Sequence, residues 1–223
     1  MKETNPPLLQ AVAFDLDGLM FNTEELYSDV GGEILRRRGK QVTQELLSEM
    51  MGRQGHVALQ IMIDWHQLDA TVPQLQAESD EVFNGLLDER LAPLPGLLCL
   101  LETLDKRQIP KAITTSSRRH FVDRCLEIAE LDGRFQFVLS AEDVRQGKPH
   151  PEIYGAAAQR FNVEAGAMLV LEDSQNGVRA AIDAGAFTVA VPGEHSREHD
   201  FSGAQFVADN LEDARIYQVL GIE

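Results

Sequence analysis

The sequence predicts an α/β fold in which a doubly wound parallel sheet carries an inserted α-helical domain. Three observations predict it. Short apolar runs recur along the 223 residues, and each one stops abruptly at polar residues. Stretches with helical spacing of apolar residues lie between the runs, and one interval is far longer than the others. Such alternation is typical of βα units that build a parallel sheet.

Five apolar runs predict the strands, because each is short and apolar on both faces, as expected for strands covered by helices on both sides. The predicted strands are residues 11–14, 109–114, 135–139, 167–171 and 188–191. The stretches between them carry the 3.6-residue spacing of amphipathic helices. The predicted helices of this core are residues 95–106, 119–129, 151–161 and 176–184.

The long interval follows the first predicted strand. From Asp15 to Lys111 it is about three times the ~30 residues that a βα unit needs. We therefore expect a Rossmann-like core of residues 1–23 and 92–223, and a helical cap of residues 24–91 that sets substrate specificity. An insertion at this point lies over the carboxyl ends of the strands, where open α/β folds bind ligands, so it is placed to act as a lid.

The composition limits the partners and the location. Lys and Arg number 20 against 36 Asp and Glu, a net charge of −16 that repels nucleic-acid backbones and anionic membranes. The two cysteines, Cys99 and Cys125, form no disulfide framework and indicate a reducing compartment. No apolar leader or membrane-length run is present. We expect a cytoplasmic monomer with no nucleic-acid or membrane partner, and a buried Cys99.

Two carboxylates, Asp15 and Asp17, directly follow the first predicted strand, and Gly18 allows a sharp turn after them. Residues at i and i+2 of an extended chain point to the same side. Paired anions at a strand end are costly unless a cation binds them or one is protonated. Oxygen ligands of this kind suit Mg²⁺, although a solvated turn is the simpler alternative.

Polar groups also follow the other predicted strands. Glu172 and Asp173 end the fourth, Thr115 and Ser116 end the second, and Lys148 lies in a loop before a predicted helix. Each taken alone is explained as well by a helix N-cap or an exposed loop residue. In a parallel sheet, however, the carboxyl ends of the strands share one edge, so these groups converge there.

The chain resembles the haloacid dehalogenase-like (HAD) superfamily, in its branch of β-phosphoglucomutase-like proteins and small-metabolite phosphatases. The resemblance rests on D-x-D-G at residues 15–18, on Thr115, on Lys148 within G-K-P-x-P, and on E-D-S-x-x-G at residues 172–177. These motifs occur in the family's order and spacing across essentially the whole chain.

The resemblance implies a role for each motif residue. Asp15 would be the nucleophile that forms an aspartyl-phosphate. Asp17 would protonate the leaving oxygen and then activate water. Thr115 and Lys148 would hold the transferring phosphoryl group. The implied activity is hydrolysis of a small phosphorylated metabolite, either a sugar phosphate or an ester similar to a nucleoside monophosphate.

The implied cofactor is Mg²⁺. The resemblance assigns its ligands as Asp15, the carbonyl of Asp17, Asp173 and, as a close second, Glu172. Phosphoryl transfer depends mainly on positioning and on charge stabilisation, which a metal ion and one lysine supply.

Four further residues are candidate substrate contacts. Gly18 and Ser116 lie within the phosphate-binding motifs. Arg53, in a polar loop of the cap at the position of the family's specificity loop, and Arg118 could contact a second anionic group or sugar hydroxyls. For each arginine, a solvated surface position is an equally good interpretation.

Departures from the family pattern favour a hydrolase over a phosphosugar mutase. The resemblance implies a histidine about a dozen residues after the nucleophile and a cap lysine in mutases. Here the position holds Tyr27, and no lysine occurs between Lys40 and Lys106. Asn22 stands where the family usually has aspartate. An intramolecular phosphosugar mutase and a non-catalytic binding module that reuses the fold remain the alternatives.

Overall fold

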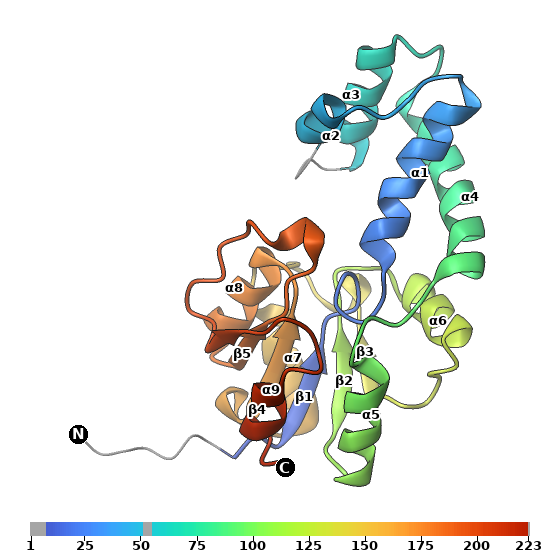
Figure 1. Ribbon diagram of the computed structural model, residues 1–223. Coiled ribbons are helices and arrows are strands. Elements are labelled where there is room, and N and C mark those ends of the chain that lie inside the picture. Colours follow the sequence, from blue (N-terminus) through green and yellow to red (C-terminus); the bar gives the residue numbers. More distant parts are fainter. Residues whose placement is uncertain (1–7, 51–54, 223) are drawn as a thin grey trace. The chain divides into compact units, whose positions relative to one another are not determined.

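The computed structural model describes residues 8–50 and 55–222, which divide into two compact units. One holds the described residues up to Asn22 together with those from Ala92 onward, and the other is Thr23–Leu91. Figure 1 shows strands and helices in the first unit and helices in the second.

The first unit is a parallel sheet of six strands in the order β3-β2-β1-β4-β5-β6, so the predicted doubly wound α/β fold is confirmed. Its strands are β1 (Ala11–Phe14), β2 (Lys111–Thr114), β3 (Phe137–Leu139), β4 (Met168–Glu172), β5 (Phe187–Ala190) and β6 (Phe206–Val207). Every residue of β1 to β4 is buried, because helices cover both faces.

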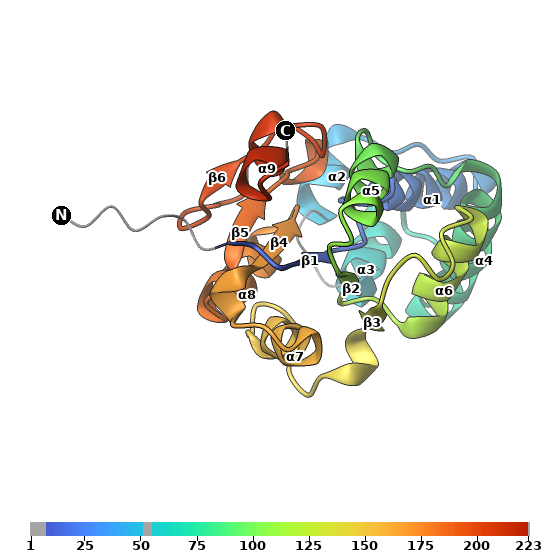
Figure 2. The same cartoon turned by 90° about the horizontal axis from the view of Figure 1, so that it is seen from below.

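Helices lie on both faces of this sheet. In Figure 2, α5 and α9 lie on one side of it, and α7 and α8 lie on the other. The helices of this unit are α5 (Leu97–Lys106), α6 (Arg119–Ile128), α7 (Glu152–Phe161), α8 (Gln175–Asp183) and α9 (Ala214–Val219). The sheet therefore forms the middle of three layers, and loops join the ends of its strands to the helices.

The strand order places a switch point between β1 and β4. The chain moves from β1 to β2 and β3 on one side, and from β4 to β5 and β6 on the other. The loops that leave β1 and β4 therefore run to opposite sides, and open α/β folds bind ligands at the carboxyl ends of strands at such a point. Phe14, the last residue of β1, pairs with Leu171, so the two strands end within one residue of each other.

The second unit contains four helices among its described residues. They are α1 (Thr23–Arg37), α2 (Gln44–Met50), α3 (Gly55–His66) and α4 (Val72–Arg90). α1 packs along α4, and the ring of Tyr27 stacks on Phe83 of α4 at 4.3 Å between centroids. Tyr27 therefore takes part in packing within this unit.

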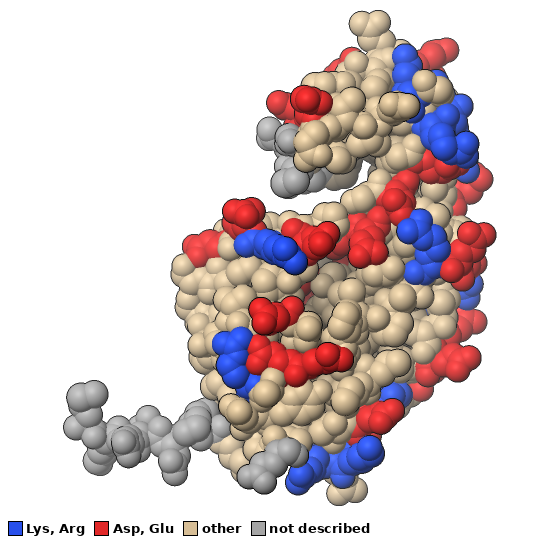
Figure 3. Space-filling view, viewed as in Figure 1, with Lys and Arg blue, Asp and Glu red and all other residues tan. Residues whose placement is uncertain are grey.

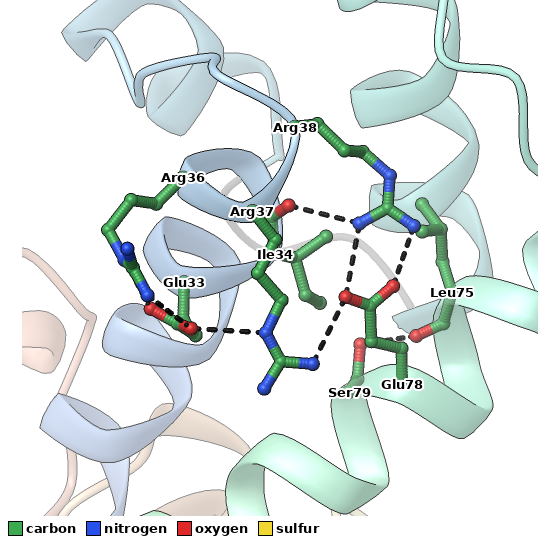
Figure 4. Close-up of polar contacts among 8 residues, drawn as sticks. All are labelled: Glu33, Ile34, Arg36, Arg37, Arg38, Leu75, Glu78 and Ser79. Carbon is green, nitrogen blue, oxygen red and sulfur yellow. Dashed lines mark hydrogen bonds and ion pairs between the residues drawn. The ribbon is translucent and has the colours of Figure 1, made fainter.

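Charged groups also join α1 to α4. The Arg38 guanidinium donates two hydrogen bonds to Glu78, at 3.1 and 2.6 Å, and one to the carbonyl of Ile34 (Figure 4). Arg37 bonds both Glu33 and Glu78. Hydrogen bonds from Arg38 hold the pKa of Glu78 below its ordinary value. These arginines are therefore paired cations at a helix C-terminus.

The two chain segments that lead into and out of the inserted unit are hydrogen-bonded to each other. The Asn22 amide N–H donates to the Ala92 carbonyl, at 3.2 Å, and the Ala92 N–H donates to Asn22 Oδ1, at 2.8 Å. The Leu94 N–H donates to the carbonyl of Met20. The aspartate that the family usually has at position 22 could accept the same hydrogen bond from Ala92. The change to asparagine therefore keeps this contact.

The expected burial of Cys99 is wrong. Leu97, Leu100, Leu101 and Leu104 form the buried stripe of α5, at the i, i+3, i+4 and i+7 spacing of one helix face. Cys99 lies off that stripe and is exposed, whereas Cys125 in α6 is buried.

The surface mixes both signs of charge. Figure 3 shows acidic side chains interspersed with basic ones over the visible face, in a chain of net charge −16. Among the described helices, none combines the length and apolarity needed to cross a bilayer.

Candidate active site

Three carboxylates meet at the carboxyl edge of the sheet, on the two strands that flank the switch point. Asp15 directly follows β1, Glu172 is the last residue of β4, and Asp173 comes next. The Asp15 N–H donates to the carbonyl of Leu171, which continues the pairing of β1 with β4. One oxygen from each carboxylate lies within 4.8 Å of the others, and all three residues are buried.

Lys148 reaches this cluster from the loop before α7. Its ammonium donates to Asp15 Oδ1, at 2.5 Å, to Glu172 Oε1 and to the carbonyl of Thr114. The Lys148 side chain is only 5% exposed. Burial opposes the charge, but Asp15 and Glu172 outweigh it and raise the pKa of Lys148 well above its ordinary value. The lysine is a fixed positive charge beside Asp15.

The carboxylates still outnumber this cation. Burial raises the pKa of Asp15 to about 8; Lys148 opposes the rise, and the neighbouring Glu172 and Asp17 add to it. A divalent cation at these oxygens would offset the excess negative charge and return Asp15 to its ionised form. Clustered carboxylate oxygens are also the donors that Mg²⁺ prefers. The residues therefore fit a bound Mg²⁺.

Glu172 is held by the start of α8. Its Oε2 accepts from the backbone N–H and the hydroxyl of Ser174, and the same hydroxyl accepts from the N–H of Gly177. A Cβ at Gly177 would lie 1.9 Å from the Glu172 carboxylate. The final glycine of E-D-S-x-x-G is therefore required by the close approach of this side chain.

Tyr154 is a buried polar residue of the site that the motifs do not identify. It lies in α7 with no exposed surface, and its hydroxyl donates to Glu172 Oε1, at 2.5 Å. Burial and the charge of Glu172 raise the pKa of Tyr154 well above its ordinary value, so the hydroxyl keeps its proton. Lys148 Nζ also lies 5.3 Å from the centre of its ring. Tyr154 thus contacts both members of the ion pair between Lys148 and Glu172.

Replacing Tyr154 with phenylalanine is expected to lower kcat for phosphate release about tenfold and to cost about 1.5–3 kcal/mol of stability, because Glu172 loses a donor in a buried place. Steady-state kinetics and urea unfolding measure the two effects. Tyr217→Phe is the matched control, since Tyr217 in α9 contacts Cys99 and not the site. Unchanged kinetics and stability in Tyr154→Phe would remove this role.

The loop after β2 supplies hydroxyls. Thr115 is buried, and its N–H donates to the carbonyl of Leu139 at the end of β3. Its Oγ1 accepts from the N–H of Ser117, at 3.0 Å. Because this bond uses a lone pair of Oγ1, the hydroxyl proton of Thr115 remains available to donate. The Ser117 hydroxyl donates to Asp17 Oδ2, at 2.5 Å.

The other predicted substrate contacts are Gly18, Ser116, Arg118 and Arg53. Gly18 has a φ of 72°, in the left-handed region that favours glycine, and it turns the chain directly after Asp17. Ser116 and Arg118 are exposed. Arg53 lies outside the described residues.

A separate surface hollow of about 680 Å³ lies in the same unit. Its wall includes the Glu152 carboxylate, which accepts from the backbone N–H groups of Arg145 and Gln146. No predicted catalytic or metal-binding residue lines it. The candidate site is therefore the strand-end cluster. The lining residues are Arg145, Gln146, His150, Pro151, Glu152, Gly155, Ala156, Gln159, Asp183 and Ala184.

Comparison with known proteins gives a family match over most of the chain. The model of the haloacid dehalogenase-like hydrolases matches residues 12–191. This span contains every motif residue named above.

Two curated phosphatases are similar to the chain. A phosphorylated carbohydrates phosphatase of Thermotoga maritima is 30% identical over 177 residues, covering 79% of this chain and 82% of its own length. A (DL)-glycerol-3-phosphatase of Arabidopsis thaliana is 35% identical over 191 residues, covering 81% and 78%. Among solved structures, a Thermotoga maritima protein assigned as a β-phosphoglucomutase has a TM-score of 0.82 and 27% identity, covering 96% of this chain and 97% of its own.

Proposed function

This chain belongs to the haloacid dehalogenase-like hydrolase family, and we propose that it is a Mg²⁺-dependent phosphatase that hydrolyses a small phosphorylated metabolite through an aspartyl-phosphate on Asp15. The observation that carries the proposal is the position of Asp15. It lies at the switch point of the sheet, 2.5 Å from Lys148 and beside two further carboxylates. A nucleophile that attacks a phosphate ester needs such positive charge beside it.

The proposed reaction has two displacements at phosphorus. In the first, a carboxylate oxygen of Asp15 forms a bond to phosphorus, the ester P–O bond breaks, and Asp17 gives its proton to the departing oxygen. In the second, Asp17 takes a proton from water as that water attacks phosphorus. The bond to Asp15 then breaks, which releases inorganic phosphate, frees the Asp15 carboxylate and leaves Asp17 protonated again, as at the start.

Thr115 and Lys148 would bind the phosphoryl oxygens during both steps. Lys148 is held by Asp15 and Glu172, so its charge is already in place before substrate binds. The Thr115 hydroxyl can donate a hydrogen bond to the phosphoryl group because its acceptor side is engaged by Ser117. When bound, Mg²⁺ would neutralise charge on the phosphoryl group.

Mg²⁺ would be held by Asp15, Asp173, the carbonyl of Asp17 and, second to these, Glu172, whose oxygens also serve Lys148 and Ser174. Wild-type protein is expected to gain about 2.7 kcal/mol of stability when Mg²⁺ is present at about 100 times its Kd. Thermal unfolding with and without Mg²⁺ measures this.

Asp173→Asn is expected to lose most of the Mg²⁺-dependent stabilisation, because it removes one charged ligand. Asp132→Asn, on an exposed turn, is the control and should retain it. Equal stabilisation of both variants by Mg²⁺ would contradict the assigned ligands.

The substrate class is proposed from the relatives, which act on phosphorylated carbohydrates and on glycerol 3-phosphate according to their names. The inserted unit would act as the cap that sets specificity, with Arg53 and Arg118 as contacts to substrate. A panel of sugar phosphates, glycerol phosphates and nucleoside monophosphates, assayed for phosphate release with Mg²⁺ and with chelator, tests the proposal. An inert panel would contradict it.

A phosphosugar mutase is the second candidate, because a protein assigned as a β-phosphoglucomutase shares the fold. Two features speak against it. Tyr27 takes the place of the expected histidine and stacks on Phe83, and no lysine occurs between Lys40 and Lys106. With a hexose 1-phosphate, isomer formation faster than phosphate release would favour the mutase.

A further inference from the structure

We propose that Ser117 is a positioning residue for Asp17, a role that rests on the proposed function. Its hydroxyl donates to Asp17 Oδ2, at 2.5 Å, across the gap between the loops that follow β2 and β1. The two residues are 100 positions apart in the chain, so only the fold brings them together. The family motifs name the threonine two residues earlier and do not include Ser117.

Hydrogen bonds hold both the N–H and the carbonyl of the Ser117 backbone. Its N–H donates to Thr115 Oγ1, at 3.0 Å, and its carbonyl accepts from the N–H of Ala141, at 3.0 Å, in the segment that follows β3. The ends of two strands therefore set the position of the Ser117 hydroxyl. A donor held in this way needs little reorganisation when substrate binds.

The simplest structural explanation, a helix cap, does not account for this hydroxyl. The N-cap of α6 is Arg118, and the backbone N–H of Arg119 is satisfied by Glu142 Oε2, at 3.0 Å. The Ser117 hydroxyl donates to a carboxylate, whereas a capping side chain accepts from a helix amide. Its contact with Asp17 is therefore separate from the start of the helix.

The bond defines the orientation of the Asp17 carboxylate. With Oδ2 held by Ser117, rotation of the carboxylate is restricted, and Oδ1 would carry the proton that Asp17 exchanges with the leaving group. Without Ser117, the side chain can rotate to other staggered positions that place this proton away from the ester oxygen. Ser117 would thus act on catalysis through Asp17 and would make no contact with the reacting atoms.

Dependence on the leaving group tests this role. An alkyl phosphate such as glycerol phosphate has a basic leaving oxygen that needs a proton, whereas p-nitrophenyl phosphate has a weakly basic one that departs without it. Ser117→Ala is expected to lower kcat/KM about tenfold or more for the alkyl ester and to leave kcat/KM for the aryl ester nearly unchanged. In the Asp17→Asn background the same change should have no further effect.

Two controls accompany the variant. Ser202→Ala removes a serine hydroxyl that also donates to an aspartate, Asp200, but on the exposed surface. It should leave kcat/KM unchanged for both the alkyl and the aryl ester. Ser117→Thr keeps the hydroxyl and should restore most of the activity toward the alkyl ester.

The outcomes separate the two proposals. Equal losses toward both esters, or no loss toward either, would overturn the positioning role while leaving the phosphatase assignment intact. A wild-type protein that hydrolyses neither ester in the presence of Mg²⁺ would overturn the proposed function, and the role of Ser117 with it.

Discussion

Asp15→Asn is expected to abolish phosphate release, with a loss of kcat on the order of 10⁴- to 10⁶-fold, the scale seen when a catalytic nucleophile is removed. The amide has the size of the carboxylate but lacks the charge and nucleophilicity needed to attack phosphorus. Phosphate release from the best ester of the panel, measured with saturating Mg²⁺, gives the result.

The same variant should remain folded. Asparagine can still accept the hydrogen bond from Lys148, and the loss of one carboxylate relieves the repulsion that, together with burial, raises the pKa of Asp15. Thermal unfolding of Asp15→Asn and of the control Asp132→Asn checks this. A folded Asp15→Asn protein with wild-type activity would exclude the aspartyl-phosphate.

Lys148→Ala is expected to have the second largest effect, because it removes a buried charge that two carboxylates share. Breaking a buried ion pair on one side costs about 3–5 kcal/mol of stability, since the partner charges are left without compensation. We also expect kcat to fall at least 10³-fold, as for other groups that stabilise charge in the transition state. Urea unfolding and steady-state kinetics measure these losses.

Mg²⁺ should restore part of the stability of Lys148→Ala and little of its activity. The cation can offset the charge of Asp15 and Glu172, but it does not replace the donor that binds the phosphoryl group. Lys106→Ala is the matched control, because Lys106 is an exposed residue of α5. Loss of stability without loss of kcat would show that Lys148 is only structural.

The five predicted strands and four predicted helices of the core agree with the structure to within two residues at each end, whereas α9 has no predicted counterpart. Strands buried on both faces are continuous apolar runs, so the first polar residue after each run marks the end of the strand in the sequence. The run at 109–114 begins two residues early because Pro110 has no N–H to join the ladder, so β2 begins at Lys111. The sequence does not predict the edge strand β6, because it is only two residues long and neither residue is buried.

The convergence of Asp15, Lys148 and Asp173 could be inferred because parallel strands share one carboxyl edge. The structure brings Asp15 and Asp173 together with Glu172 and places Lys148 between two of them. Their catalytic and metal-binding roles stay predictions.

Ser117 and Tyr154 could not be found in the same way. Their function depends on where a side chain points within a loop or a helix, and neither residue lies in a motif position. A faint signal exists for Tyr154, which lies six residues after Lys148 on the buried face of α7. For Ser117, the neighbouring Ser116 was named, and only the fold shows which hydroxyl reaches Asp17.

Chemical trapping of the aspartyl-phosphate tests the central claim most directly. Protein turning over substrate with Mg²⁺ is quenched in acid and reduced with borohydride, which converts an acyl phosphate of aspartate to homoserine. Mass spectrometry then locates the change in the tryptic peptide of residues 3–36. Homoserine at position 15 only when substrate is present is the predicted result. An unmodified Asp15 in protein that releases phosphate, with reduction at another carboxylate, would contradict it.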